Sequence, residues 1–81
     1  MKVILKDTTN PHFQKDIGKI YGLSNATVGM IAILWSLREN DEVDEGQTIN
    51  TSPIVDVQIR HNNIILRTKS KSVYTLSVLN Q

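Results

Sequence analysis

The sequence contains no cysteine, no long apolar run, and only one tryptophan, two tyrosines and one phenylalanine. Without cysteine the chain forms no disulfide, no thiolate metal site and no cysteine nucleophile, which suits a reducing cytosol. With so few aromatic side chains, use in the core is favoured over base stacking. The longest strongly apolar run, 28–37, is about half of the roughly 18 to 20 residues that a membrane span needs. We therefore expect a cytoplasmic protein that makes no membrane contact.

Residues that carry catalysis or bind metal ions are also scarce. The two histidines, His12 and His61, lie far apart in the chain and have no acidic or cysteine neighbour at metal-ligand spacing. No glycine-rich phosphate loop is present, and no base is arranged by sequence to activate Ser24 or Ser52. The sequence therefore predicts a binding protein with no catalytic site, no metal site and no cofactor.

The 81 residues, 40% hydrophobic and 21% charged, suit one folded domain, and a second core would not fit. Because a core of this size is limited, part of the stability can come from self-association, and a homodimer is expected to be possible. Charge is segregated: 1–38 holds five basic and two acidic residues, 39–56 six acidic and no basic, and 57–81 four basic and no acidic. A basic end can meet phosphate or an acidic partner.

The N-terminal region is predicted to begin with a strand and a helix. Lys2–Lys6 is a short β-type run. Asn10 is placed to cap a helix, and Pro11 suits its first position. Apolar residues at helical spacing extend this helix over His12–Tyr21. Gly22 then ends it, as a C-terminal glycine commonly does.

A second helix is predicted from Asn25 to about Arg38, with Ser24 as its cap. This segment is apolar on every side and rich in β-branched residues. A buried strand has the same pattern. The sequence alone therefore leaves 26–37 open between helix and strand.

The C-terminal part predicts an acidic connector, 39–47, followed by a β-meander over 48–81. Apolar and polar residues alternate in Ile54–Arg60, which puts Val55, Val57 and Ile59 on one face. Asparagines after this run supply turn chemistry, and two further strands follow at Ile64–Thr68 and Val73–Leu79. Three antiparallel strands are expected.

Small and apolar residues in 14–33 have the spacing of a known DNA-binding motif. Gly18 stands where two helices would touch, Gly22 stands at a turn that needs positive φ, and Leu-Ser-x-x-Thr-Val begins at Leu23. On these residues the segment resembles the helix-turn-helix of DNA-binding regulators. The resemblance implies a small transcription regulator that binds double-stranded DNA as a homodimer.

That resemblance also implies a set of contact residues. The helix pair would dock on DNA through Lys15, Lys19, Ser24, Asn25 and Thr27. A basic hairpin would contact the phosphates, as a wing does, through Arg60, Arg67, Lys69 and Lys71. The fold expected on this interpretation is α+β: an N-terminal strand, the helix pair and a three-stranded antiparallel sheet, all within the single domain 1–81.

A second interpretation starts from the positions that the motif would present to the major groove, where only Asn25 is a side chain that commonly reads bases. These positions are Ser24, Asn25, Ala26, Gly29, Met30 and Ile33. On this interpretation the face binds a protein partner or a second copy through Met30, Ile33, Leu34 and Leu37.

In addition, Thr51–Val55 and Arg67–Leu76 resemble the tail of small uncharacterised phage proteins. This resemblance implies a phage-type accessory protein that binds and modulates a host protein without contacting nucleic acid. Its fold would be a small all-β, SH3-like barrel with a strand over 27–37.

Overall fold

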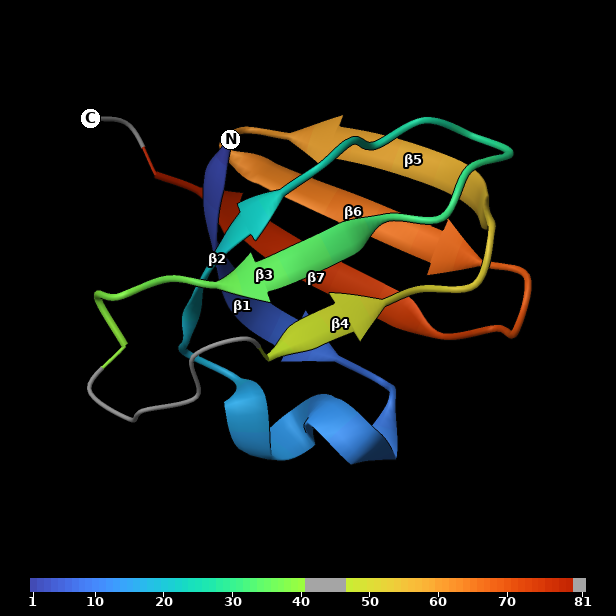
Figure 1. Ribbon diagram of the computed structural model, residues 1–81. Helices are drawn as coiled ribbons and strands as arrows, with labels where there is room; N and C mark the ends of the chain where they lie inside the picture. Colours follow the sequence, from blue (N-terminus) through green and yellow to red (C-terminus); the bar gives the residue numbers. More distant parts are fainter. Residues whose placement is uncertain (41–46, 80–81) are drawn as a thin grey trace.

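The computed structural model describes residues 1–40 and 47–79, which form one antiparallel sheet of seven strands and one short 3-10 helix (Figure 1). The helix is η1 (Pro11–Asp16), and the strands are β1 (Lys2–Thr8), β2 (Ile20–Leu23), β3 (Ile33–Ser36), β4 (Thr48–Asn50), β5 (Ile54–Arg60), β6 (Asn63–Thr68) and β7 (Val73–Val78). The strand order in the sheet is β4-β3-β2-β1-β7-β6-β5. The all-β class of the alternative is therefore confirmed, although its strand over 27–37 is limited to Ile33–Ser36, and the α+β prediction is wrong.

The two outermost strands of the sheet, β4 and β5, follow one another in the chain. β4 pairs with β3, and β5 pairs with β6. At their junction the amide of Thr51 donates to the Ala32 carbonyl at 2.9 Å, and the amide of Ile54 donates to the Met30 carbonyl at 2.8 Å. Residues 48–54 therefore run alongside β3 and the residues that precede it, 30–32. Residues 54–60 then pair with β6. This bent segment curls the sheet, so that β3 crosses in front of β7 in Figure 1.

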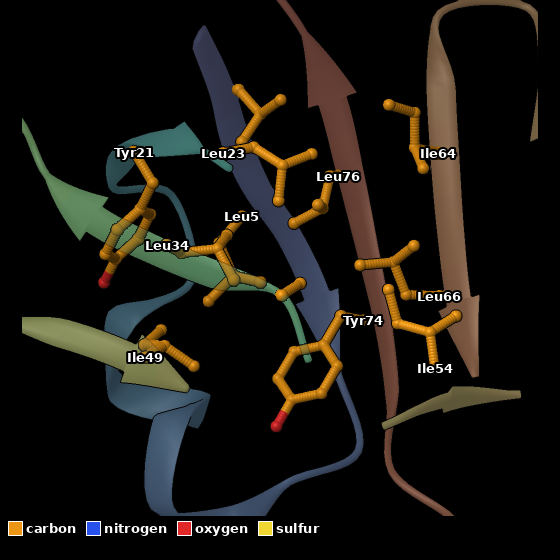
Figure 2. Close-up of a cluster of buried hydrophobic side chains, with 12 residues drawn as sticks. Leu5, Tyr21, Leu23, Leu34, Ile49, Ile54, Ile64, Leu66, Tyr74 and Leu76 are labelled. Atoms are coloured by element: carbon orange, nitrogen blue, oxygen red, sulfur yellow. The ribbon is translucent and has the colours of Figure 1, made fainter. Parts of the chain in front are cut away.

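The hydrophobic core lies inside the curl, where side chains from both halves of the sheet point toward one another (Figure 2). Alternate residues of each strand reach it, as the two-residue period of a strand requires. The buried apolar residues are Val3, Leu5, Tyr21, Leu23, Ala32, Leu34, Ile49, Ile54, Ile64, Leu66, Tyr74 and Leu76. Helix η1 lies at one end of the sheet and packs Phe13 against this cluster.

The helix-turn-helix prediction for 14–33 is wrong. Helix η1 ends at Asp16, β2 follows at Ile20–Leu23, and a loop leads from there to β3. The second segment is apolar on every side because its inner face enters the core while its outer face is exposed: Leu34 is 0% exposed and Trp35 is 40% exposed. That alternation has the period of a strand. Without a helix pair there is no recognition helix for a major groove, so the predicted DNA-binding regulator is overturned as well.

The start of the first helix is confirmed, and its length is wrong. The Asn10 side chain accepts a hydrogen bond from the amide of His12 at 3.0 Å, and Pro11 begins η1. The helix extends to Asp16 instead of Tyr21 because the chain turns at Gly18, where φ is 98°. Gly22, for which the helix-turn-helix pattern required positive φ, lies within β2.

The C-terminal meander is confirmed, since β5, β6 and β7 pair in chain order. One detail differs: a register shift between Ile54 and Asp56 breaks the alternation in β5. Such a bulge shifts the alternation by one residue, so Ile54 and Val57, three residues apart, both face the core, while Val55 is 54% exposed. Most of the predicted acidic connector, 41–46, lies outside the described residues.

The turn between β6 and β7 contains a backbone conformation that favours glycine. Lys71 has a φ of 70°, and its amide donates to the Thr68 carbonyl at 2.8 Å. A side chain in the left-handed region costs about 1–2 kcal/mol, whereas glycine adopts it freely. We expect Lys71→Gly to raise the free energy of unfolding by about 1 kcal/mol in urea denaturation. Lys69→Gly removes the same charge from the same turn without this relief, and equal stability of the two variants would contradict the prediction.

Candidate functional site

The residues predicted to contact DNA lie in several separate elements. Lys15 lies in η1, and Ser24, Asn25 and Thr27 lie in the loop between β2 and β3. Arg60 precedes the turn between β5 and β6, whereas Lys69 and Lys71 lie in the turn at the other end of β6, next to Arg67. The basic hairpin therefore has its charges at opposite ends of a strand. Its charges therefore do not lie together at one turn, where a wing would present them to the phosphates.

Lys19 has a structural role. Its ammonium lies 2.9 Å from the Asp16 carboxylate, which is 1% exposed. The Gln47 amide donates to the other carboxylate oxygen of Asp16 at 3.2 Å. A buried carboxylate needs such partners, because burial removes its hydration. The three-residue spacing of Asp16 and Lys19 was a signal of this pair that the DNA interpretation overlooked.

Ser24 and Asn25 hold the loop between β2 and β3 in shape. The Ser24 hydroxyl accepts a hydrogen bond from the amide of Ile33 at 3.0 Å. The Asn25 side chain accepts from the amide of Thr27 at 3.0 Å and donates to the Ile31 carbonyl at 3.2 Å. These polar groups are therefore engaged with the backbone of the loop, which positions the apolar side chains described next.

An exposed apolar surface lies along this loop and β3. Five large apolar side chains, each between 37% and 59% exposed, occur within eight residues of chain. They are Val28, Met30, Ile31, Ile33 and Trp35, and together they define the outer apolar surface. Exposed apolar patches mark interaction sites more often than scattered apolar residues do.

The strand neighbours of this surface carry no charge. Ile33 is opposite Asn50 of β4, and Trp35 is opposite Thr48 of β4 and Gly22 of β2. Ile33 and Trp35 project from the outer side of the sheet because the residue between them points into the core. The outer side of β2, β3 and β4 is thus an apolar strip with uncharged flanks.

A charged pair lies near the β1 side of the strip. Lys2 of β1 is opposite Gly22, and its ammonium is hydrogen-bonded to the Glu39 carboxylate. This hydrogen bond holds the pKa of the Glu39 carboxyl below its ordinary value. The positive charge of Lys2 on this side is therefore matched by the negative charge of Glu39.

Trp35 lies flat against the backbone of β2. A Cβ built on Gly22 would overlap the indole ring of Trp35. Only glycine leaves room for this contact, which buries one face of the indole and leaves the rest exposed. Gly22 therefore has a packing role in a strand, where the sequence pattern suggested a turn.

The residues predicted for a partner or dimer surface fall on both sides of the sheet. Met30 and Ile33 belong to the outer apolar surface, and Leu37 is half-buried. Leu34 is fully buried in the core and is not available to a partner. Val28, Ile31 and Trp35 were not predicted. Treating the segment as a strand with Leu34 inward would have identified Ile31 and Trp35.

Within residues 1–40 and 47–79 no three histidine, cysteine, aspartate or glutamate side chains gather as metal ligands. No helix in that part of the chain is long and apolar enough to cross a membrane. No protein-family model, curated protein or solved structure matches the chain. The predicted resemblance of the C-terminal half to small phage proteins is therefore unsupported, and the strands that suggested it are ordinary antiparallel hairpins.

Proposed function

We propose that this protein is a binding module, without catalytic activity, that docks on a partner protein through the outer apolar surface. The observation that carries the proposal is the exposure of five large apolar side chains within eight residues, of which Ile33 and Trp35 have uncharged strand neighbours. Surfaces depleted of charge and rich in apolar and aromatic side chains are typical of the centre of protein interfaces. A tryptophan in such a surface is a frequent source of binding energy.

The chemistry of the surface favours one kind of partner, an amphipathic helix. β3 is an interior strand, bonded to β2 on one side and β4 on the other, so its backbone offers no edge to an added strand. Docking must therefore use side chains, as when a helix packs on a sheet. Residues 28–30 lie in a turn, and the extended part, 31–35, spans roughly 13 Å. A helix with its side chains is about 10 Å wide. A strip this narrow suits one helix better than a broad interface of about 800 Å² per partner.

The test compares two variants in capture from cell extract and then with the purified partner. Ile31→Ser combined with Ile33→Ser removes two apolar side chains from the surface. Both are already more than half buried, so each loses about 0.7 kcal/mol of binding free energy. We expect the dissociation constant for the partner helix, measured by calorimetry, to rise at least about tenfold.

Ile17→Ser is the matched control, because Ile17 is 42% exposed and follows η1, outside the surface. It should bind as wild type does. If the double variant binds every captured partner as tightly as wild type, the proposal is wrong. It is also wrong if the double variant instead changes the sedimentation of the protein alone, since the surface would then be a self-association face.

A further inference from the structure

A second feature is the outer edge of β5, which begins next to the loop of the outer apolar surface and runs away from it. β5 is an outermost strand with β6 on one side. On its other side Ile54 bonds to Gly29 and Met30. Beyond Ile54 that edge makes no backbone hydrogen bond to any residue of the described chain. An open edge of this kind is a template for pairing with another strand.

The register of β5 identifies the groups that face outward. Arg60 and Asn63 flank a two-residue turn, so they exchange backbone hydrogen bonds with each other. Bonding alternates along an antiparallel pair, so Gln58 also bonds to β6. The amides and carbonyls of Val57 and Ile59 therefore point away from the sheet. Ile59 is 71% exposed, the most exposed of the large apolar side chains in residues 1–40 and 47–79.

The side chains along β5 are ordered so that the strand is complementary to a second, antiparallel copy of itself. When two copies of β5 run antiparallel about a two-fold axis at Gln58, Asp56 is opposite Arg60 of the second copy. Val57 is then opposite Ile59 of the second copy. The outward amides and carbonyls of these two residues meet in hydrogen-bonded pairs, and the charged residues meet in the closer, non-hydrogen-bonded pairs.

Neighbouring registers lose this match. An axis at Val57 places Arg60 opposite Ile54, whose edge is already bonded to Gly29 and Met30. An axis at Asp56 places two aspartates opposite each other, and an axis at Arg60 does the same with two arginines. Like charges directly opposite are destabilising. Only the axis at Gln58 joins opposite charges, and it does so twice by symmetry.

We propose that this protein self-associates through β5, with the axis at Gln58, into a dimer whose two sheets form one continuous sheet. Four backbone hydrogen bonds, the two Asp56–Arg60 pairs and the contacts of Ile59 hold the two copies together. In the single chain Asp56 has only a loose contact with Arg67, at 3.8 Å between charged atoms. The contact is smaller than a standard interface of about 1,200–2,000 Å², so the dimer is weak and requires high protein concentration.

The first test is sedimentation equilibrium up to about 1 mM protein, a range that detects weak association. Wild type should show a dimer whose fraction rises with concentration. Ile59→Pro removes an outward amide that β6 does not use, and proline is tolerated on such an edge. This variant should be monomeric throughout. Ile59→Ala keeps the amide and should still dimerise. A monomeric wild type, or a dimer that persists in Ile59→Pro, overturns the proposal.

A charge exchange tests the register without altering the backbone. Asp56→Arg and Arg60→Asp each place like charges opposite one another, and each should weaken dimerisation about tenfold or more. The double variant restores opposite charges and should dimerise within about threefold of wild type. Arg67 stays beside position 56 in the Asp56→Arg single variant and in the double variant alike. Recovery of dimerisation in the double variant therefore cannot come from the contact with Arg67 within one chain. Failure to recover overturns the register. None of these substitutions changes the outer apolar surface, so partner binding is tested separately.

Discussion

Replacing Leu34 by alanine is expected to lower the free energy of unfolding by about 2–5 kcal/mol, the range for a leucine truncated within a packed core. Leu34 is 0% exposed and packs among buried side chains from both halves of the sheet (Figure 2). An 81-residue domain has a total stability of about 4–12 kcal/mol. The variant therefore loses a large part of that stability, which urea denaturation followed by circular dichroism would measure.

Ile33→Ala is the matched control for Leu34→Ala. Ile33 is the adjacent residue and projects from the other side of β3, where it is 37% exposed. Because its truncation leaves no enclosed cavity, we expect Ile33→Ala to lower the free energy of unfolding by less than about 1 kcal/mol. Similar costs at the two positions would contradict the alternation in β3, and with it the assignment of one residue to the core and the other to the surface.

Where local pattern and fold agree, the sequence is sufficient. β6 and β7 alternate cleanly, with Ile64, Leu66, Tyr74 and Leu76 inward. Their turns are short, so each strand pairs with its neighbour in the chain. Asn10 likewise acts through a residue two positions away. Such features depend on nearby residues only, and sequence periodicity and capping rules describe them well.

The region 26–37 could not be predicted because two different demands make it uniformly apolar. Leu34 is apolar because it enters the core, and Ile33 and Trp35 are apolar on the exposed side. A strand with two apolar faces has no alternation to detect, and its pattern matches a buried helix. Gly18 and Gly22 then match a helix-turn-helix by spacing, although one serves a turn and the other contacts an indole.

Long-range contacts have no local signal at all. Asn40 shows this most clearly: its side chain accepts from the amide of Ile20 at 2.7 Å and donates to the carbonyl of the same residue at 2.8 Å. The side-chain amide of Asn40 thus pairs with the backbone of Ile20, the first residue of β2, as the backbone of another strand would. Twenty residues separate the two positions, and asparagine is common in loops for other reasons. The contact is visible only once the sheet is formed.

Gly22→Ala is expected to lower the free energy of unfolding by about 2–3 kcal/mol, the upper part of the range for overpacking. The added methyl group would occupy the space of the Trp35 indole, which must leave the sheet. Trp35 is the only tryptophan, so its fluorescence emission should shift to longer wavelength as it becomes hydrated. Unfolding in urea and the emission spectrum of the folded state measure the two effects separately.

The cause is isolated by repeating Gly22→Ala in a Trp35→Ala background. With the indole absent, alanine meets no obstacle and has a smaller entropic cost than glycine in a strand, by about 0.5–1 kcal/mol. The substitution should then be neutral or stabilising, and the resulting coupling of at least about 2 kcal/mol is typical of residues in contact. An equal cost in both backgrounds would show that the contact between Gly22 and Trp35 does not cause the loss of stability. Since Trp35 is part of the outer apolar surface, the same substitution should also weaken partner binding, which links a strand glycine to the shape of that surface.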